Sequence, residues 1–230
     1  MKKLNILYED SDILVCVKNA GVSSQSERGR ALDVTSQINN HLIATGRRGV
    51  EPYVVHRLDK PVSGILVYAL NKKAAADLSK QVAEGKFEKS YYAILTAMPS
   101  TGMEAHLNHL LARGKYNASK IADEKDIAEG VETKEAILDY KIIRELEFED
   151  KTYYLADINL KTGRHHQIRV QFAGVDAPIY GDRKYDPDGY LGEKSGLALC
   201  SYRLKFKHPA TGKVMKYEIL PSGSIFSIAF

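Results

Sequence analysis

The sequence predicts an α+β fold built on a largely antiparallel sheet. Many short segments carry strand patterns, whereas only about two carry a clear helical pattern. The helices do not recur after every strand, as repeated βαβ units would require. A chain of 230 residues buries a substantial core, and it has no internal repeat and no Pro/Gly-rich linker. We therefore expect a single domain over residues 1–230, in the form of one large body or two tightly joined lobes.

The elements of the first part of the chain alternate in type. Residues 13–17 form an apolar run typical of a buried strand, and residues 18–21 follow as a turn. Residues 31–45 predict a helix with Gly46 as a C-cap candidate, and one helical face carries Leu32, Val34, Ile38, Leu42 and Ile43. Residues 64–70 (GILVYAL) predict a strand that is buried on both faces.

The rest of the chain is dominated by strands. Residues 72–84 predict a helix that ends at Gly85, and residues 87–97 predict a long strand. Residues 100–134 are polar and mixed in charge, which predicts a loop-rich insertion. Further strands are expected at residues 136–140, 153–160, 166–172, 202–207 and 214–220.

Composition excludes several classes of protein. No run approaches the length of a membrane-spanning helix, and the N-terminus lacks the apolar region of a signal peptide. Cys16 and Cys200 are the only cysteines and lie far apart, so we expect no disulfide framework and no zinc cluster, but reduced core thiols in a cytoplasmic protein. The net charge of +4 is compatible with a polyanionic partner.

The segment HRLDKPVSG at residues 56–64 is the strongest candidate for chemistry. Asp59 lies between Arg57 and Lys60, directly before the apolar strand. Nearby positive charge favours the ionised carboxylate, and a positioned carboxylate is a nucleophile or a base at a sugar carbon. In isolation, the same residues also fit an ordinary surface ion pair.

A second candidate is KTGRHHQIRVQ at residues 161–171. We expect residues 162–163 to be a turn that opens a strand, with Arg164 at its entrance, where a guanidinium binds a carboxylate or a phosphate. On a strand, His165 and His166 point to opposite faces, and no further ligand lies at a familiar spacing, so we expect no metal site.

Two further segments fit structural or binding roles. Tyr91 and Tyr92 lie on a predicted strand and face opposite ways, so one fits the core and the other fits a cleft, where its ring offers a flat surface to a base. Residues 178–185 (PIYGDRKY) are typical of a structural corner.

In their order, these segments resemble the RluA-type family of RNA pseudouridine synthases. The resemblance runs over almost the whole chain. The family motifs H-R-L-D-x-x-T-S-G, K-x-Y-x-A, T-G-R-x-H-Q-I-R, G-D-x-x-Y and L-x-F-x-H-P are matched at residues 56–64, 89–93, 162–169, 181–185 and 204–209. The opening residues 8–10 and 18–21 also fit, with Asn19 where proline is usual. Val62 replaces the family's threonine and removes a hydroxyl near the site.

The resemblance implies a fold and an activity. The fold is a mostly antiparallel curved central sheet in two lobes, with flanking helices and a central catalytic cleft. The activity is isomerisation of uridine in structured rRNA or tRNA to pseudouridine, which requires no cofactor and no metal. Because the matching region opens at about Tyr8, we expect a stand-alone catalytic domain without an N-terminal S4 domain, a monomer with no membrane attachment.

The resemblance also assigns roles to residues. Asp59 is the essential carboxylate, which attacks C1′ or C6 or removes a proton from C2′. Arg164 pairs with Asp59 and aims it. Tyr91 stacks on the uracil and takes the C5 proton. Arg57 enters the RNA stack where the uridine is flipped out.

Further basic residues are candidates for RNA contacts outside the reacting base. Such contacts hold phosphates and position the RNA without reading its sequence. The candidates are Lys60, His166 and Arg169, together with Arg113, Lys115, Arg183, Lys184 and Arg203.

Two other functions compete with this interpretation. The first is an RNA-binding or RNA-folding protein without catalysis on the same fold, whose signature would be loss of Asp59 or Arg164. The second is a nucleosidase or glycosidase on small substrates, which usually needs a second carboxylate as acid. Asp59 and Arg164 are both present, and no paired carboxylate motif lies near Asp59.

Overall fold

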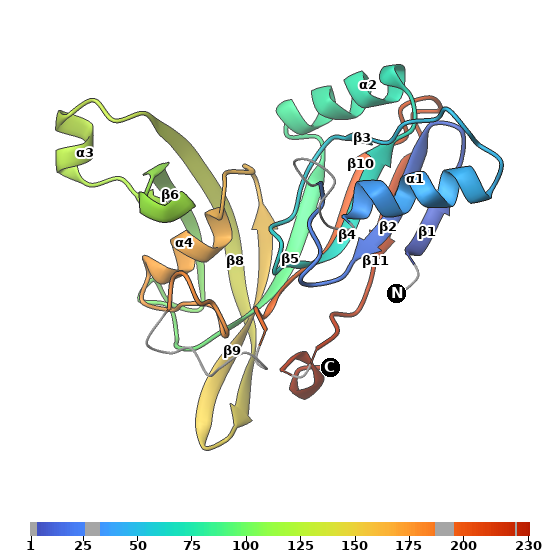
Figure 1. Ribbon diagram of the computed structural model, residues 1–230. Helices are drawn as coiled ribbons and strands as arrows, with labels where there is room; N and C mark the ends of the chain where they lie inside the picture. The colour runs from blue at the N-terminus through green and yellow to red at the C-terminus, as the bar shows by residue number, and fades with distance from the viewer. Residues whose placement is uncertain (1–3, 26–32, 187–195, 224) are drawn as a thin grey trace. The chain divides into compact units, whose positions relative to one another are not determined.

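The computed structural model describes residues 4–25, 33–186, 196–223 and 225–230. The chain divides into two compact units (Figure 1). The first comprises Met1–Glu88 and Ser201–Leu220, and the second comprises Lys89–Cys200 and Pro221–Phe230. The division supports the expectation of two lobes, while the expected central cleft and the single domain stay predictions.

The first unit holds six strands and two helices among its described residues. The sheet order is β1-β2-β4-β10, with β3 on β4 and β11 on β10. Strand β10 begins with two residues of the second unit. The elements are β1 (Asn5–Glu9), β2 (Ile13–Lys18), α1 (Val34–Ala44), β3 (Tyr53–Val54), β4 (Ser63–Ala69), α2 (Lys72–Ala83), β10 (Leu199–Lys207) and β11 (Val214–Glu218).

Helix α2 covers the sheet of the first unit. The Asn71 side chain caps its first turn by accepting from the Ala74 amide at 2.9 Å. Ala74 and Leu78 form its buried face and join a core cluster that includes Ile65 and Val67 of β4. The remaining core residues of this cluster are Ile13, Val15, Ala69, Phe87, Leu204 and Phe206.

Gly64 allows β4 to lie against β10 at the start of the strand. Its φ is +131°, a conformation that side chains rarely adopt. A Cβ built on Gly64 would collide with the backbone carbonyl oxygen of Ser201 in β10. The glycine at the end of the 56–64 motif therefore has a structural cause, namely the close approach of two backbones directly after the Asp59 loop.

Gly64→Ala is expected to lower the free energy of unfolding by about 3 kcal/mol or more, because backbone strain and a collision with backbone add together. Thermal or urea unfolding measures the loss. Gly46→Ala is the matched control: Gly46 also has positive φ, at +83°, but its Cβ would meet nothing within 4 Å. Equal losses in the two variants would show that the close approach to β10 is unimportant.

The second unit has sheet order β5-β9-β8-β6-β7. Every ladder between these strands is antiparallel. Helix α4 contacts β6 and β7, and Val170 of this helix packs with Leu111 and Ala136. The elements are β5 (Glu88–Leu95), β6 (Glu104–Arg113), the single turn η1 (Lys115–Asn117), β7 (Ser119–Ile121), α3 (Glu124–Ala128), β8 (Thr133–Phe148), β9 (Lys151–Leu160), α4 (Gln167–Ala173) and η2 (Phe226–Ile228).

Several expectations for the second unit were wrong. Residues 100–134 are not a loop-rich insertion, because they hold β6, β7, α3 and the start of β8. Residues 166–172 do not form a strand, because α4 occupies them. The described chain has four α-helices instead of two.

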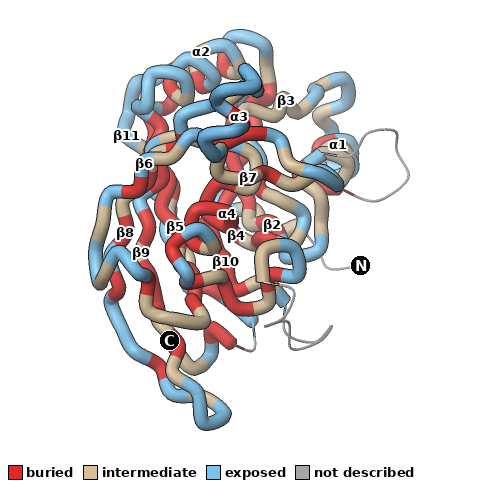
Figure 2. The backbone as a smooth tube through the Cα atoms, turned by 90° about the vertical axis from the view of Figure 1, so that its left-hand side faces the viewer, coloured by how far each residue is buried: buried red, intermediate tan, exposed pale blue. Residues whose placement is uncertain are grey.

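The fold class itself is confirmed: the protein is α+β with mostly antiparallel strands. Figure 2 shows buried positions along the strands and exposed positions on α2 and at the turn between β8 and β9. Helix α1 begins at Val34, and the expected contribution of Leu32 lies outside the described residues. In the described ranges, no helix combines the length and the hydropathy that crossing a membrane would need.

Candidate active site

Asp59 lies on a loop of the first unit whose backbone is fixed on both sides of the carboxylate. Before it, the Leu58 amide donates to Ser24 Oγ at 3.1 Å, and Ser24 Oγ donates to the Leu58 carbonyl at 2.9 Å. After it, the Lys60 carbonyl accepts from the Gly21 amide at 2.8 Å. Asp59 is half-buried, between buried Leu58 and exposed Lys60. The structure therefore holds the backbone rigidly while the carboxylate remains partly accessible.

Lys18 joins this loop to the turn after β2. Its ammonium donates to the carbonyls of Val22 at 2.6 Å, Lys60 at 3.1 Å and Asn19 at 3.2 Å. The side chain is 1% exposed. Burial lowers the pKa of Lys18 to about 8, and the charge of Asp59 opposes this shift. A buried cation thus anchors the loop and acts electrostatically on Asp59.

No separate role was predicted for Lys18, although it lies in the matched opening turn. Its position was a signal. Lys18 directly follows the apolar residues 13–17 and is still part of β2, whereas the turn begins at the next residue. His56 also has a structural role, because its Nε2 accepts from the Val67 amide at 3.1 Å and its ring centroid lies 5.0 Å from that of Phe87. Arg57 is exposed beside Asp59.

The stability of the protein is expected to carry a pH signature of Lys18. Its pKa is lower in the folded chain than the unfolded value of about 10.4. Between about pH 8 and pH 10 the unfolded state therefore binds more protons, and the contribution of this group to the free energy of unfolding rises with pH. The cost of burying the charge is present in full below about pH 8.

Lys18→Met removes this signature. The free energy of unfolding of wild type, relative to that of Lys18→Met, is expected to increase between about pH 7.5 and pH 10. Urea unfolding at each pH measures it. The matched control is Lys60→Met, whose exposed ammonium loses little water on folding. A Lys18→Met difference that stays constant with pH would contradict the assignment.

In the second unit, Arg164 lies on a tight turn before α4. The Gln167 side chain holds this turn: its Oε1 accepts from the Arg164 amide at 3.0 Å and from Thr162 Oγ1 at 2.7 Å. Gln167 Nε2 donates to the Ile137 carbonyl of β8 at 3.0 Å. The exposed Arg164 donates through Nε to the Glu135 carbonyl at 2.8 Å. Two other residues of the family motif, Thr162 and Gln167, therefore hold the turn that carries the Arg164 guanidinium.

Lys89 of β5 lies against the same turn. A Cβ added to Gly163 would come within 3.3 Å of Lys89 Nζ. Burial lowers the pKa of Lys89, and the positive charge of Arg164 lowers it further. Two neighbouring cations of this kind create a potential that attracts an anion.

Tyr91 follows two residues later on β5, opposite Ile158 of β9. Its side chain is 5% exposed, whereas Tyr92 is less buried and lies with its ring centroid 5.1 Å from that of Phe230. The expectation that the two tyrosines face opposite ways agrees with this difference in burial.

The geometry at the two histidines corrects the sequence interpretation. His165 and His166 do not point apart, because their rings stack at a centroid distance of 3.8 Å. His166 has φ of +54° at the position before α4, which turns the chain into the helix. Its Nδ1 forms a hydrogen bond of 2.9 Å with the hydroxyl of Tyr185.

Arg169 also differs from expectation. It is 6% exposed and forms a buried, two-pronged ion pair with Asp182, at 2.8 Å from Nε and 2.7 Å from Nη2. Asp182 further accepts from the amides of Lys184 and Tyr185. The geometry argues against a phosphate contact from Arg169. The ion pair instead ties α4 to the GDRKY corner.

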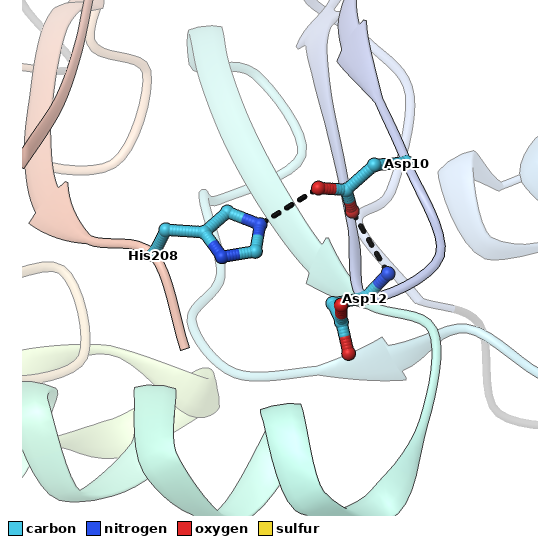
Figure 3. Close-up of side chains that lie close together, drawn as sticks. All are labelled: Asp10, Asp12 and His208. Atoms are coloured by element: carbon cyan, nitrogen blue, oxygen red, sulfur yellow. Dashed lines mark hydrogen bonds and ion pairs between the residues drawn. The ribbon is translucent and has the colours of Figure 1, made fainter. Parts of the chain in front are cut away.

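One further cluster, in the first unit, resembles a metal site but is a hydrogen-bonded corner (Figure 3). Potential ligand atoms of Asp10, Asp12 and His208 lie within 4.8 Å of one another. His208 Nδ1 accepts from two backbone amides, so its Nε2 carries the proton that it donates to Asp10 at 2.7 Å. Burial tends to raise the pKa of Asp10, but backbone hydrogen bonds from Ile13 and Asp12 outweigh it and the pKa is lowered.

Comparison with known proteins places these segments in one family. The family model for RNA pseudouridylate synthase matches residues 12–174, a span that includes Asp59, Tyr91 and Arg164. The chain belongs to the RNA pseudouridylate synthase family. The family resemblance expected from the ordered motifs is confirmed, and the protein is a pseudouridine synthase by membership.

Curated members of the RNA pseudouridylate synthase family match over most of this chain. An uncharacterized RNA pseudouridine synthase of Aquifex aeolicus is 33% identical over 94% of this chain and 69% of its own length. The ribosomal large subunit pseudouridine synthase D of Zymomonas mobilis is 31% identical, over 94% and 68%. The tRNA pseudouridine synthase C of Vibrio parahaemolyticus is 31% identical, over 94% and 91%.

Solved structures of this family share the fold. Human RNA pseudouridylate synthase domain containing 1 superimposes with a TM-score of 0.76 at 22% identity, covering 95% of this chain and 83% of that one. Human RNA pseudouridylate synthase domain containing 4 gives a TM-score of 0.74 at 19% identity, covering 98% and 91%. The predicted pseudouridine synthase fold is thereby confirmed.

Proposed function

We propose that this protein converts specific uridines of structured rRNA or tRNA to pseudouridine, with Asp59 as the catalytic carboxylate. The observation that carries the assignment is the loop described above. Its backbone is bonded on both sides of Asp59, while Asp59 itself is half-buried. Fixing a reactive group before the substrate arrives lowers the entropic part of the barrier.

The reaction needs only rearrangement of the substrate. The N1–C1′ bond of uridine breaks, the uracil turns over, and C5 bonds to C1′. The hydrogen on C5 leaves as a proton, and N1 gains one. Asp59 either forms a covalent bond to C1′ or C6 or removes a proton from C2′; each route uses an ionised carboxylate.

Arg164 and Tyr91 complete the proposed catalytic group. The exposed Arg164 lies on a turn held by Gln167, and its neighbour Lys89 adds positive charge. Both features support a role in pairing with a carboxylate. Tyr91 offers an aromatic ring to the uracil and a hydroxyl for the C5 proton. Arg57, which is exposed and two residues before Asp59, fills the space left by the flipped nucleotide.

The proposal extends to the residues that contact RNA phosphates, to the classes of RNA and to the cellular compartment. The exposed Lys60 is proposed to contact an RNA phosphate. His166, beside the Arg164 turn, is proposed to make a second such contact. Relatives named for the ribosomal large subunit and for tRNA support both RNA classes as substrates. Cys16 and Cys200 are both buried and form no disulfide, which fits a reducing compartment such as the cytoplasm, where the protein would act as a monomer.

Tritium release from RNA labelled at C5 of uridine tests the proposal. Bulk tRNA and bulk rRNA from cells lacking the enzyme are the two substrates, and Asp59→Asn is the control. Wild type alone is expected to release tritium, and the RNA pool from which tritium is released identifies the class of substrate. Intact RNA binding without release from either pool would favour a non-catalytic RNA-binding protein.

A further inference from the structure

The turn between β6 and β7 carries a tyrosine that the fold does not explain. Tyr116 is 93% exposed, and its backbone is left-handed, with φ 52° and ψ 41°. Asn117 follows with φ 53°. Glycine, asparagine and aspartate suit such positions, whereas a bulky side chain there costs about 1 kcal/mol or more. Asn117 fits this rule, but Tyr116 is strained and gains no packing in return.

The backbone of this turn is held in place. Lys184 Nζ donates to the carbonyls of Tyr116 at 2.9 Å and Asn117 at 3.2 Å. Arg113 donates to Asn117 Oδ1 at 2.8 Å. The Gly114 amide donates to the Ala118 carbonyl at 3.0 Å. A ring presented outward from a fixed backbone loses little conformational freedom when it meets a partner.

The surroundings of the ring are positively charged. The stretch from residue 105 to residue 122 contains no aspartate or glutamate. Arg113, Lys115 and Lys184 are all exposed at the turn. An exposed aromatic ring among cations fits a single-stranded nucleic acid, since bases stack on the ring and phosphates meet the charges.

The turn is also connected to the Arg164 segment within the second unit. Ser119, the first residue of β7, donates through Oγ to the His165 carbonyl at 2.7 Å. The Ser119 amide donates to the Tyr185 hydroxyl at 2.9 Å, and this hydroxyl bonds to His166 Nδ1. These hydrogen bonds therefore join the β6–β7 hairpin to the turn that bears Arg164.

We propose that the β6–β7 turn is an additional RNA-binding element, in which the Tyr116 ring stacks on an unpaired base of the substrate away from the reacting uridine. Arg113 and Lys115 contact the adjoining phosphates. The proposal rests on the proposed function for its RNA partner. It assigns this turn to substrate selection, because a base splayed from structured RNA must reach the ring.

Fluorescence provides a direct test, because the chain contains no tryptophan. Tyr116→Trp introduces a single reporter, titrated with bulk tRNA and bulk rRNA in an Asp59→Asn background, so that turnover plays no part. Stacking on a base is expected to quench its emission. Ile143→Trp, at a position 45% exposed on β8, is the control that should respond little. Inorganic polyphosphate supplies charge without bases and should leave the emission unquenched.

Affinity and stability separate binding from folding. Tyr116→Asn is expected to weaken RNA binding by about tenfold, and Tyr116→Phe to retain it. Tyr116→Asn should at the same time unfold at an equal or higher temperature, because asparagine tolerates the backbone. Unquenched emission from bound protein, equal quenching by polyphosphate, or unchanged affinity of Tyr116→Asn would each overturn the proposal. Tritium release by wild type with any of these results would leave the proposed function standing.

Discussion

An Asp59→Asn variant is expected to lose pseudouridine formation by about 10⁴-fold or more, while it keeps the fold and the RNA affinity of wild type. The amide has nearly the shape of the carboxylate but is a poor nucleophile and a poor base. The hydrogen bonds that fix the loop come from Leu58 and Lys60 backbone groups, which the substitution leaves in place. Tritium release, thermal unfolding and filter binding to RNA measure the three properties.

Glu51→Gln is the matched control for this variant. It removes one exposed negative charge close to the same loop in sequence, and it should leave activity, unfolding temperature and affinity unchanged. An unfolded Asp59→Asn protein would make Asp59 a structural residue. Full activity of the variant would move the catalytic assignment to another group.

The second large effect is expected from Arg169→Met, which leaves the Asp182 carboxylate charged in a buried position. Asp182 is 0% exposed at its side chain in the ion pair. Removing one partner of a buried pair costs about 3–5 kcal/mol, because the remaining charge has lost both its counter-ion and its water. Urea unfolding at neutral pH measures the loss, which is large compared with the stability of an ordinary domain.

The surface pair of Lys205 and Glu88 provides the comparison. Its atoms lie 2.8 Å apart, but the two side chains are 44% and 57% exposed. Lys205→Met should therefore cost at most about 1 kcal/mol. Should Arg169→Met cost no more than this, the buried pair would not be the link between α4 and the GDRKY corner.

The sequence predicted the first unit better than the second for a physical reason. Strands β2 and β4 are continuous apolar runs, and α2 is bounded by Asn71 and Gly85, so pattern and end signals agree. In α4, every residue from Gln167 to Phe172 is buried. A wholly buried helix shows no periodicity of its own, and its alternation of apolar and polar residues imitated a strand.

Strand β6 was missed because its segment is polar and its leucines do not alternate as in a strand. Leu107, Leu110 and Leu111 have the i, i+3, i+4 spacing of a helical face, yet they pair with β8 in antiparallel register. Leu110 is in fact 42% exposed. Pairing with a strand about thirty residues away decided the outcome, and no local pattern contains that partner.

The catalytic roles in the candidate site stay predictions from the sequence. Motif order led to Asp59, Tyr91 and Arg164, and the family match includes all three. It did not reveal the residues that hold them. Lys18, Ser24 and Gln167 act through hydrogen bonds to distant backbone groups, which depend on the folded arrangement.

The first unit is assembled from two stretches of chain separated by residues 89–200. In the finished unit β4 lies between β2 and β10, but β10 is synthesised only after that long interval. At roughly 5–20 residues per second on the ribosome, synthesis from Ala69 to Leu199 takes about 7–26 seconds. During this time most of one edge of β4 is unpaired, because β3 pairs only with Tyr68 and Ala69. An apolar strand with an open edge attracts other strands. The nascent chain is therefore most exposed to aggregation and to chaperone binding during synthesis of the second unit, and the arrival of β10 ends that period.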